Sequence, residues 1–244
     1  MTTAPVFLCS RESIEGGDRL VLDGPEGRHA AKVRRLAPGE ALDLVDGDGL
    51  RVRCVVDTVT ADGLVALVQS RVLEAEPRPR VVVVQALAKG DRGERAVEML
   101  TEVGVDEIVP WSASRSVTQW RPGRGDKALE RWRSIGRESA KQARRAWFPV
   151  IEAGTTTRDV IARLGSCACP LVLDETATDQ LGAVPLPTSG EVVLVVGPEG
   201  GFSPDELAAF RQAGATAVNL GPSVLRTSTA GVVAAGVVLS RTRW

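Results

Sequence analysis

The segment that most constrains the fold is an apolar, β-branched run, Val192–Val196, that ends abruptly in Gly197-Pro-Glu-Gly-Gly-Phe-Ser-Pro204. Three glycines and two prolines directly behind such a run predict a buried strand that feeds a tight loop and then a helix. Ser203 is a suitable N-cap, Pro204 suits the first helical position, and Glu206 stands three residues after the serine, which is the pattern of a capping box. In an α/β sheet, a loop at the carboxyl end of a strand is where ligands usually bind.

The apolar patterns after residue 80 alternate between strand and helix, which predicts a parallel α/β sheet. We expect strands at 81–87, 107–111, 170–173, 191–196 and 217–220, and helices at 91–103, 126–145, 204–213 and from about residue 227. The first 73 residues differ, because short apolar runs separated by turn signals predict a small β-barrel or sandwich. These runs are 19–22, 41–45, 51–56 and 64–68, and a helical stretch, 26–36, interrupts them.

Residues 74–80 carry two prolines and four charges, which disfavour both a helix and a central strand. They predict a linker between a domain of residues 1–73 and a domain of residues 81–244, and 244 residues suffice for two such cores. The longest apolar run, 230–239, is shorter than the roughly 20 residues of a membrane span. No basic segment followed by an apolar one opens the chain, so we expect no secretory signal and a cytoplasmic location.

The charges are unevenly distributed along a chain whose formal net charge is −1. Residues 1–76 contain nine basic and thirteen acidic side chains, whereas residues 115–145 contain ten basic and three acidic ones. Such a basic segment is typical of a protein that binds a polyanion, although a solvated helix face gives the same composition.

Several common signatures are absent from the sequence. There is no P-loop motif, no G-x-G-x-x-G after the first strand of the α/β part, and only one histidine, His29, which makes a Ser-His-Asp triad improbable. The four cysteines form no C-x-x-C pair, and we expect no metal site. Two loops remain, 197–203 and 221–230, which either enclose one small ligand or are plain turns between strands and helices.

These two loops carry a resemblance to a known family. The runs Val195–Glu206 and Asn219–Ala230 closely resemble motifs of the 16S rRNA (uracil-N3)-methyltransferases, the RsmE family of the SPOUT class. The similarity continues over most of the chain in order. The further matching segments are His29–Leu36, Lys89–Glu94, Thr101–Pro110, Arg131-Trp132 and Glu138–Arg145.

The resemblance implies the fold, the cofactor and the assembly. It implies a C-terminal SPOUT α/β methyltransferase domain with a deep trefoil knot, a small N-terminal PUA-like β-barrel that binds RNA, and a homodimer. The implied cofactor is S-adenosylmethionine, held in the knot mainly by backbone groups, with no metal. The cofactor-binding residues implied are Leu173, Gly197, Pro198, Glu199, Gly200, Gly201, Leu220, Gly221, Leu225, Arg226, Thr227, Thr229 and Ala230.

The implied reaction is methylation of N3 of a uridine near the 3′ end of 16S rRNA in the small ribosomal subunit. An arginine aimed at the uracil would stabilise the negative charge that develops there. Arg226 and Arg145 are the candidates, while Glu199 could orient groups or accept a proton. The alternatives are that Arg226 makes a structural cap or pair, that Arg145 only holds phosphate, and that Glu199 orders its loop.

The implied RNA contacts are basic side chains, because arginine pairs with phosphate and stacks on bases. They are His29, Lys32, Arg34, Arg35, Lys89, Arg92, Arg115, Arg137, Arg144 and Arg145. Lys141 and Arg144 depart from the family pattern, which has an acidic and a small residue there. Two other functions stay open: a related knotted methyltransferase that modifies a ribose 2′-hydroxyl or a tRNA base, and a non-catalytic rRNA-binding assembly factor.

Overall fold

The computed structural model describes residues 4–120 and 123–244, and the packing within it divides the chain into two compact units. The N-terminal unit comprises the described residues up to Glu76 together with Ala140–Phe148, and the C-terminal unit comprises Pro77–Ser139 and Pro149–Trp244. The last strand of the first unit ends at Leu73 and the first strand of the second begins at Arg80, the last residue of the expected linker, so 74–79 lie between the two strands. The domain identities assigned to 1–73 and 81–244 stay predictions. None of the described helices is long and apolar enough to cross a bilayer.

The N-terminal unit contains one mixed five-stranded sheet. Its strands, in sheet order, are β1 (Val6–Leu8), β3 (Ala41–Val45), β4 (Leu50–Val59), β5 (Leu64–Leu73) and β2 (Arg19–Leu22). The pair β1–β3 is parallel and the other pairs are antiparallel. Alternate residues such as Leu42, Val52 and Leu64 are buried in one core beneath the sheet. Because β1 and β2 lie at the two edges, the described strands form an open half-barrel rather than a closed barrel.

The helical stretch expected at 26–36 is shorter and irregular. It consists of α2 (Gly24–Arg28) followed by one π-helical turn, His29–Val33. Two other elements, α1 (Arg11–Glu15) and β1, were not expected, because they are too short to show a periodic pattern in the sequence. A Cβ on Gly27 would lie 2.4 Å from the carbonyl oxygen of Leu22, so the glycine allows α2 to approach the end of β2.

The segment Ala140–Phe148 packs within the N-terminal unit, although the sequence-based division placed it with residues 81–244. Lys141 Nζ donates to Glu26 Oε1 over 2.7 Å, and the Trp147 indole N–H donates to the carbonyl of Glu74. The Lys141 side chain is only 5 % exposed. The lysine that departs from the family pattern at this position therefore forms a buried ion pair with Glu26.

The C-terminal unit is built on a six-stranded sheet in which every pairing is parallel, as expected from the alternating pattern. In sheet order its strands are β11 (Thr216–Val218), β9 (Cys169–Leu173), β10 (Glu191–Val196), β6 (Arg80–Ala86), β7 (Glu107–Trp111) and β8 (Val150–Ile151). Its helices are α3 (Arg92–Val103), α4 (Arg124–Gln142), α5 (Thr157–Leu164), α6 (Pro204–Gln212) and α7 (Thr227–Thr242), with a 3₁₀ turn at Leu181–Ala183. The sequence patterns missed β8, α5 and this turn.

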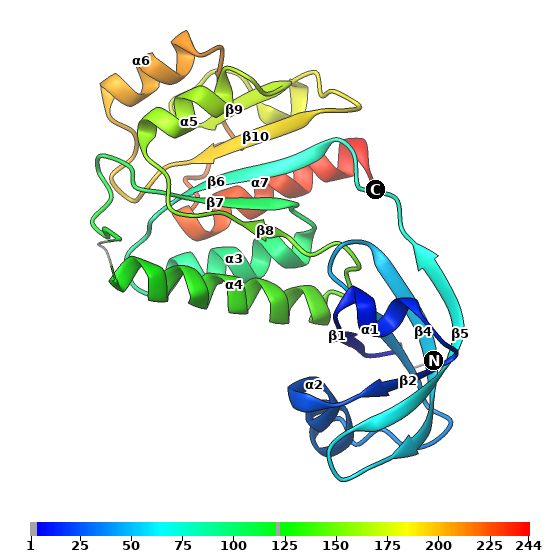
Figure 1. Cartoon of the computed structure of the whole chain (residues 1–244). Helices are drawn as coiled ribbons and strands as arrows, with labels where there is room; N and C mark the ends of the chain where they lie inside the picture. The colour runs from blue at the N-terminus through cyan, green and yellow to red at the C-terminus, as the bar shows by residue number, and fades with distance from the viewer. Residues whose placement is uncertain (1–3, 121–122) are drawn as a thin grey trace. The chain divides into compact units, whose positions relative to one another are not determined.

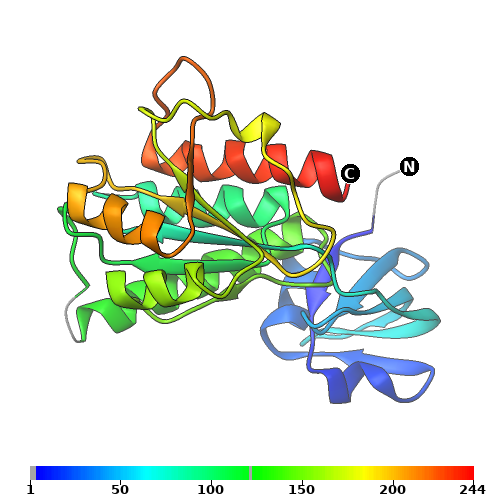
Figure 2. The same cartoon turned by 90° about the horizontal axis from the view of Figure 1, so that it is seen from above.

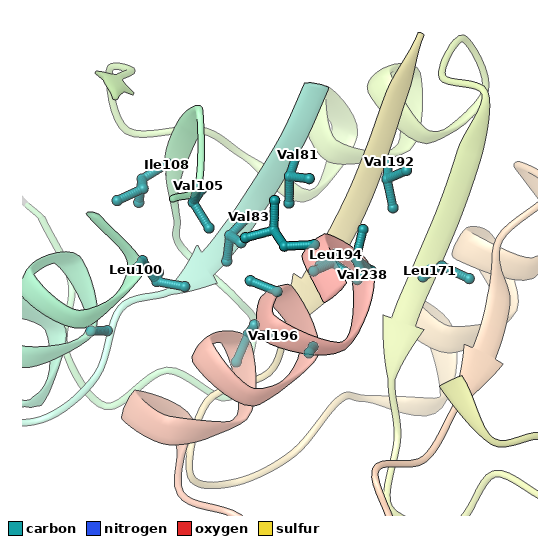
Figure 3. Packing of buried hydrophobic residues seen from close by; sticks show 14 of the residues in the cluster. Val81, Val83, Leu100, Val105, Ile108, Leu171, Val192, Leu194, Val196 and Val238 are labelled. Carbon is teal, nitrogen blue, oxygen red and sulfur yellow. The ribbon is translucent and has the colours of Figure 1, made fainter. Parts of the chain in front are cut away.

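Helices cover both faces of this sheet (Figure 1). Val81 and Val83 of β6 face α3, α4 and α7, whereas Val82 and Val84 face α5 and α6. Figure 2 shows α7 alongside α3, and these two helices pack directly against each other. Figure 3 shows the core between β6, β10 and α7, where Leu194 and Val238 are fully buried. Both faces are therefore apolar, as in a doubly covered parallel sheet.

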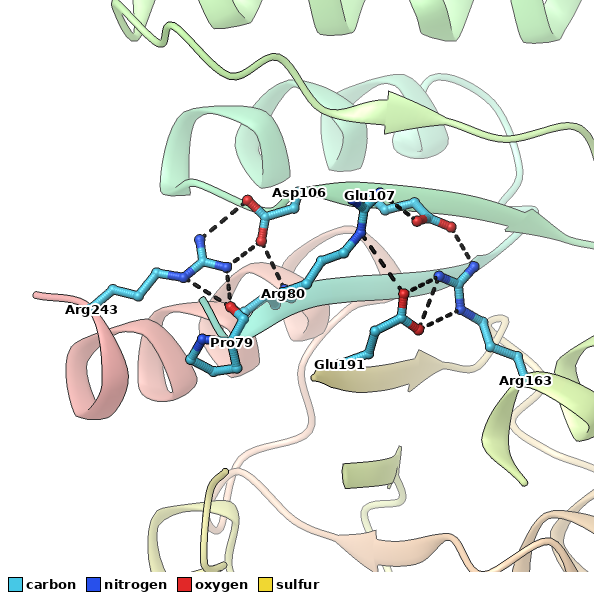
Figure 4. Close-up of polar contacts among 8 residues, drawn as sticks. Pro79, Arg80, Asp106, Glu107, Arg163, Glu191 and Arg243 are labelled. Carbon is cyan, nitrogen blue, oxygen red and sulfur yellow. Dashed lines mark hydrogen bonds and ion pairs between the residues drawn. The ribbon is translucent and has the colours of Figure 1, made fainter. Parts of the chain in front are cut away.

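Ion pairs join the amino-terminal ends of the strands (Figure 4). Arg163 of α5 pairs with Glu107 and Glu191, which open β7 and β10. Near the C terminus, Arg243 pairs with Asp106, whose carboxylate also accepts the backbone N–H of Val81. These interactions tie strand ends together at the edge opposite to the carboxyl ends, where the candidate site lies.

Candidate functional site

A cavity of about 660 Å³ opens at the carboxyl ends of β9 and β10 and at the start of α7. Its walls include the loop behind β10 and the segment that precedes α7, so the structure brings the two loops of the sequence analysis together. The lining residues are Arg92, Arg115, Leu173–Thr176, Val196–Phe202, Leu207, Val224–Thr227 and Ala230. A smaller cavity of about 100 Å³ shares part of this wall and is lined by Leu173–Glu175, Val218–Leu225 and Ala230.

Most of the expected cofactor-binding residues line these cavities. The larger cavity includes Leu173, Gly197, Pro198, Glu199, Gly200, Gly201, Leu225, Arg226, Thr227 and Ala230, and the smaller one adds Leu220 and Gly221. Thr229 lines neither cavity, and its backbone N–H donates to the carbonyl of Arg226 within the first turn of α7. The individual binding roles stay predictions.

The capping box at Ser203 is confirmed, and it reaches further than the sequence showed. Glu206 accepts the backbone N–H of Ser203 and, through its other oxygen, the backbone N–H of Ser114, both over 2.8 Å. Burial opposes ionisation of this carboxyl, but the hydrogen bonds from Ser114 and Ser203 outweigh it and lower the pKa of Glu206. One buried carboxylate thus joins the loop behind β10 to the loop behind β7.

Glu199 holds the glycine loop against the segment behind β6. Its Oε1 accepts the backbone N–H of Lys89 over 3.1 Å and a guanidinium N–H of Arg92 over 3.0 Å. Partial burial raises the pKa of Glu199, but hydrogen bonds from its own backbone, Lys89 and Arg92 lower it more, and the net pKa is below the ordinary value. A carboxylate held in this way is a weak base, so the geometry favours a loop-ordering role.

Three arginines line the larger cavity, and they differ in their partners. Arg92 pairs with Glu199, and Arg115 donates to the carbonyl oxygen of Gly200 over 3.2 Å. Arg226 is the N-cap residue of α7, and within the described part of the chain no hydrogen bond or ion pair holds its guanidinium. Of these three side chains, Arg226 is therefore the one available to a ligand.

Sequence reasoning missed Asp174 and Thr176, which line the larger cavity directly behind β9. Asp174 is 8 % exposed, and its Oδ1 accepts the backbone N–H and the hydroxyl of Thr176 over 2.9 and 2.8 Å. Its Oδ2 is buried without a hydrogen-bond partner among the described residues. The signal was in the sequence, because Asp174 follows the expected strand 170–173 at the carboxyl edge of the sheet, where ligands bind.

The expected RNA-binding side chains fall in both units. Lys89, Arg92, Arg115 and Arg137 belong to the C-terminal unit, and His29, Lys32, Arg34, Arg35, Arg144 and Arg145 to the N-terminal unit. The candidate catalytic residue Arg145 is thus in the N-terminal unit and does not line the cavity that Arg226 and Glu199 line. Most of these side chains are exposed, while His29, Arg92 and Arg145 are half-buried. Residues 121 and 122 of the basic segment lie outside the described residues.

The tryptophans near the basic segment pack into the protein. Trp111 is fully buried and stacks on Phe202, with ring centroids 5.9 Å apart, and Trp132 is 4 % exposed and packs edge-to-face with Trp120. Within the described residues no group of three histidine, cysteine or acidic side chains could hold a metal ion, and the four cysteines are free.

Comparisons with known proteins agree on one family. Residues 74–239 match the family described as RNA methyltransferase domain, and residues 22–68 match the RNA methyltransferase PUA domain.

The ribosomal RNA small subunit methyltransferase E of Mycobacterium bovis is 48 % identical over 229 residues, which cover 92 % of this chain and 87 % of the relative. The Bacillus subtilis protein of the same name is 27 % identical, with 96 % and 94 % covered. A crystal structure of the Neisseria gonorrhoeae ribosomal RNA small subunit methyltransferase E bound to S-adenosyl methionine superposes with a TM-score of 0.84, at 25 % identity and 98 % coverage of both chains.

Proposed function

The chain belongs to the ribosomal RNA small subunit methyltransferase E family, and from that premise we propose that it methylates N3 of a uridine near the 3′ end of 16S rRNA. The observation that carries this proposal is the cavity formed by the two glycine-containing loops, with an unpaired arginine at its wall. The substrate is rRNA of the small ribosomal subunit, as the names of the relatives indicate.

The cavity fits S-adenosylmethionine, the cofactor named with the solved relative. Its volume of about 660 Å³ lies within the usual range of small-molecule sites, and its wall includes the glycine-containing segment Gly197–Gly201. A Cβ on Gly200 would lie 3.2 Å from Cβ of Arg115, so the loop needs glycine there to keep this close approach. The buried oxygen of Asp174 that lacks a donor also points to a polar ligand in this cavity.

When bound, the cofactor supplies a sulfonium methyl group to the uracil N3 after that nitrogen has lost its proton. The residues of this chain then have to orient the base and stabilise its negative charge, which spreads over the carbonyl oxygens. We assign this role to Arg226, because it lines the cavity and its guanidinium has no protein partner among the described residues. Glu199, engaged by Lys89 and Arg92, orders the loop, and we assign no proton transfer to it.

The remaining parts of the proposal concern RNA, topology and assembly. We assign the basic side chains of both units, Arg145 among them, to RNA phosphate contacts. We take the deep trefoil knot of the C-terminal loops and helix from the family resemblance, and the crossing from β10 past β9 to β11 is compatible with it. The homodimer and the cytoplasmic location implied by the resemblance stay predictions.

The test is methyl transfer to small ribosomal subunits isolated from cells that lack this modification, followed by mass spectrometry of the nucleosides. We expect N3-methyluridine. A 2′-O-methylated nucleoside, a methylated tRNA base, or cofactor binding without transfer would each contradict the proposal and indicate one of the other functions.

The variant that tests the role of Arg226 is Arg226→Ala. Loss of one group that stabilises developing charge lowers kcat by roughly 100-fold or more, whereas the Kd for S-adenosylmethionine should change by less than about 3-fold. Arg211→Ala, an exposed arginine of α6 outside the cavity, is the matched control and should leave both unchanged. An equal loss of turnover and cofactor affinity in Arg226→Ala would assign Arg226 to cofactor binding instead.

A further inference from the structure

Among the described residues that line the cavities, Asp174 is the one whose carboxylate has a buried oxygen without a hydrogen-bond partner. Its Oδ1 is held by the backbone N–H and the hydroxyl of Thr176, which fixes the orientation of the carboxylate. Its Oδ2 is buried and has no donor within the described residues. By contrast, Oε1 of Glu199 accepts hydrogen bonds from both Lys89 and Arg92.

A buried carboxylate oxygen without a donor is unfavourable, because desolvation of the charge is not compensated. Asp174 is more than nine-tenths buried, so bulk water does not solvate it freely. The backbone of Asp174 is itself fixed, because its N–H donates to the carbonyl of Val218 in the neighbouring strand β11. The side chain is therefore oriented before any ligand enters, with one acceptor site left for a ligand donor.

The position of Asp174 indicates which part of a nucleoside would meet it. The smaller cavity is lined by apolar side chains such as Leu220, Pro222 and Val224, which suit a flat purine ring. The larger cavity also contains Arg92 and Arg115, and their guanidinium groups suit a carboxylate. Asp174 belongs to the wall shared by both cavities, where the sugar between the base and the amino-acid part of the cofactor would lie.

We infer that the Asp174 carboxylate accepts a hydrogen bond from a ribose hydroxyl of the bound cofactor and so selects a ribonucleoside ligand. An acidic side chain at the carboxyl edge of a parallel sheet is a chemically suited partner for ribose hydroxyls, because it offers only acceptors. This inference rests on the proposed function in that it takes S-adenosylmethionine as the occupant of the cavity.

The experiment is calorimetric titration of the full chain with S-adenosylhomocysteine and with its 2′-deoxy and 3′-deoxy forms. Wild-type protein should bind at least one deoxy form about 10- to 100-fold more weakly, as expected for a lost hydrogen bond to a charged group. Asp174→Asn should weaken binding of the full ligand by about the same factor and no longer distinguish it from that deoxy form. Asp205→Asn, at an exposed carboxylate that lines neither cavity, should bind like wild type.

The outcomes separate this inference from the proposed function. If wild-type protein binds neither S-adenosylmethionine nor S-adenosylhomocysteine, the proposed function fails. If wild type binds but Asp174→Asn discriminates against the deoxy forms as wild type does, the ribose assignment is overturned. It is also overturned if the effect of Asp174→Asn disappears with a ligand that lacks the α-amino group, since the ammonium would then be the donor. Urea unfolding of the cofactor-free variants verifies that each is folded, and Thr176→Val, which removes one donor to Oδ1, gives a second, milder perturbation.

Discussion

Glu206→Gln is the substitution that most directly tests how the glycine loop is held. Glu206 is 4 % exposed and accepts backbone N–H groups from Ser203 and Ser114, each over 2.8 Å. Glutamine has nearly the same shape, but it offers one oxygen and one NH₂ group. One of the two backbone N–H groups would therefore face another donor in a buried position.

The expected loss of stability follows from the hydrogen bond and the charge that the substitution removes. A hydrogen bond to a charged group contributes about 1.5–3 kcal/mol, and an acidic side chain in the first turn of a helix contributes about 0.3–1 kcal/mol more. Glu206→Gln should therefore lower the free energy of unfolding by about 2–4 kcal/mol at pH 7. Asp205→Asn removes an exposed charge from the same turn and should cost no more than about 1 kcal/mol.

The pH dependence gives an independent measure. The pKa of Glu206 is lower in the folded protein than in the unfolded chain, so its contribution is fully present above the unfolded pKa of about 4.3. That contribution is lost as the pH falls through the lower folded pKa. The difference in stability between wild type and Glu206→Gln should thus be constant from pH 7 to about pH 5 and shrink at lower pH.

The assay is urea unfolding followed by tryptophan fluorescence, since Trp111 stacks on Phe202 in the loop that Glu206 holds. If Glu206→Gln costs no more than Asp205→Asn, the two hydrogen bonds do not stabilise the loop as inferred. A stability difference that stays unchanged down to pH 3.5 would likewise contradict the assignment of the lowered pKa.

Two further substitutions test other parts of the C-terminal unit. Arg163→Met removes the guanidinium that the carboxylates of Glu107 and Glu191 share. Because the Arg163 side chain is 24 % exposed, the loss should lie between the values for surface and fully buried ion pairs. We expect the free energy of unfolding to fall by about 1–3 kcal/mol. Arg158→Met, exposed on the same helix, is the control for the urea titration, and an equal effect of the two variants would show that the ion pairs add nothing. Gly201→Val places a β-branched residue at φ +65° in the cavity wall and should abolish cofactor binding in calorimetry while the chain stays folded. Gly214→Val introduces comparable backbone strain, at φ +92°, but lies outside the cavity and should retain its affinity for the cofactor. Similar cofactor affinities of Gly201→Val and Gly214→Val would exclude the 197–203 loop from the binding site.

Local patterns in the sequence determined much of this protein. The alternation of strands and helices predicted the parallel sheet, and Ser203 with Glu206 predicted the cap of α6, because periodicity and capping depend on residues within a few positions of one another. The two glycine-containing segments also located both walls of the cavity. The resemblance of these segments to one family then predicted the cofactor.

Only the tertiary structure decided which distant residues meet. The strand order β11-β9-β10-β6-β7-β8 places Asp174, which follows β9, in the same cavity as the loop behind β10. It also brings Ser114 to Glu206, and the packing of Ala140–Phe148 brings Lys141 to Glu26. Strand order and partner choice depend on how whole elements bury their apolar faces together, and no short window of sequence contains that information. The chemistry of the loops could therefore be predicted from the sequence, whereas only the strand order decided that Asp174 lies in the same cavity as these loops.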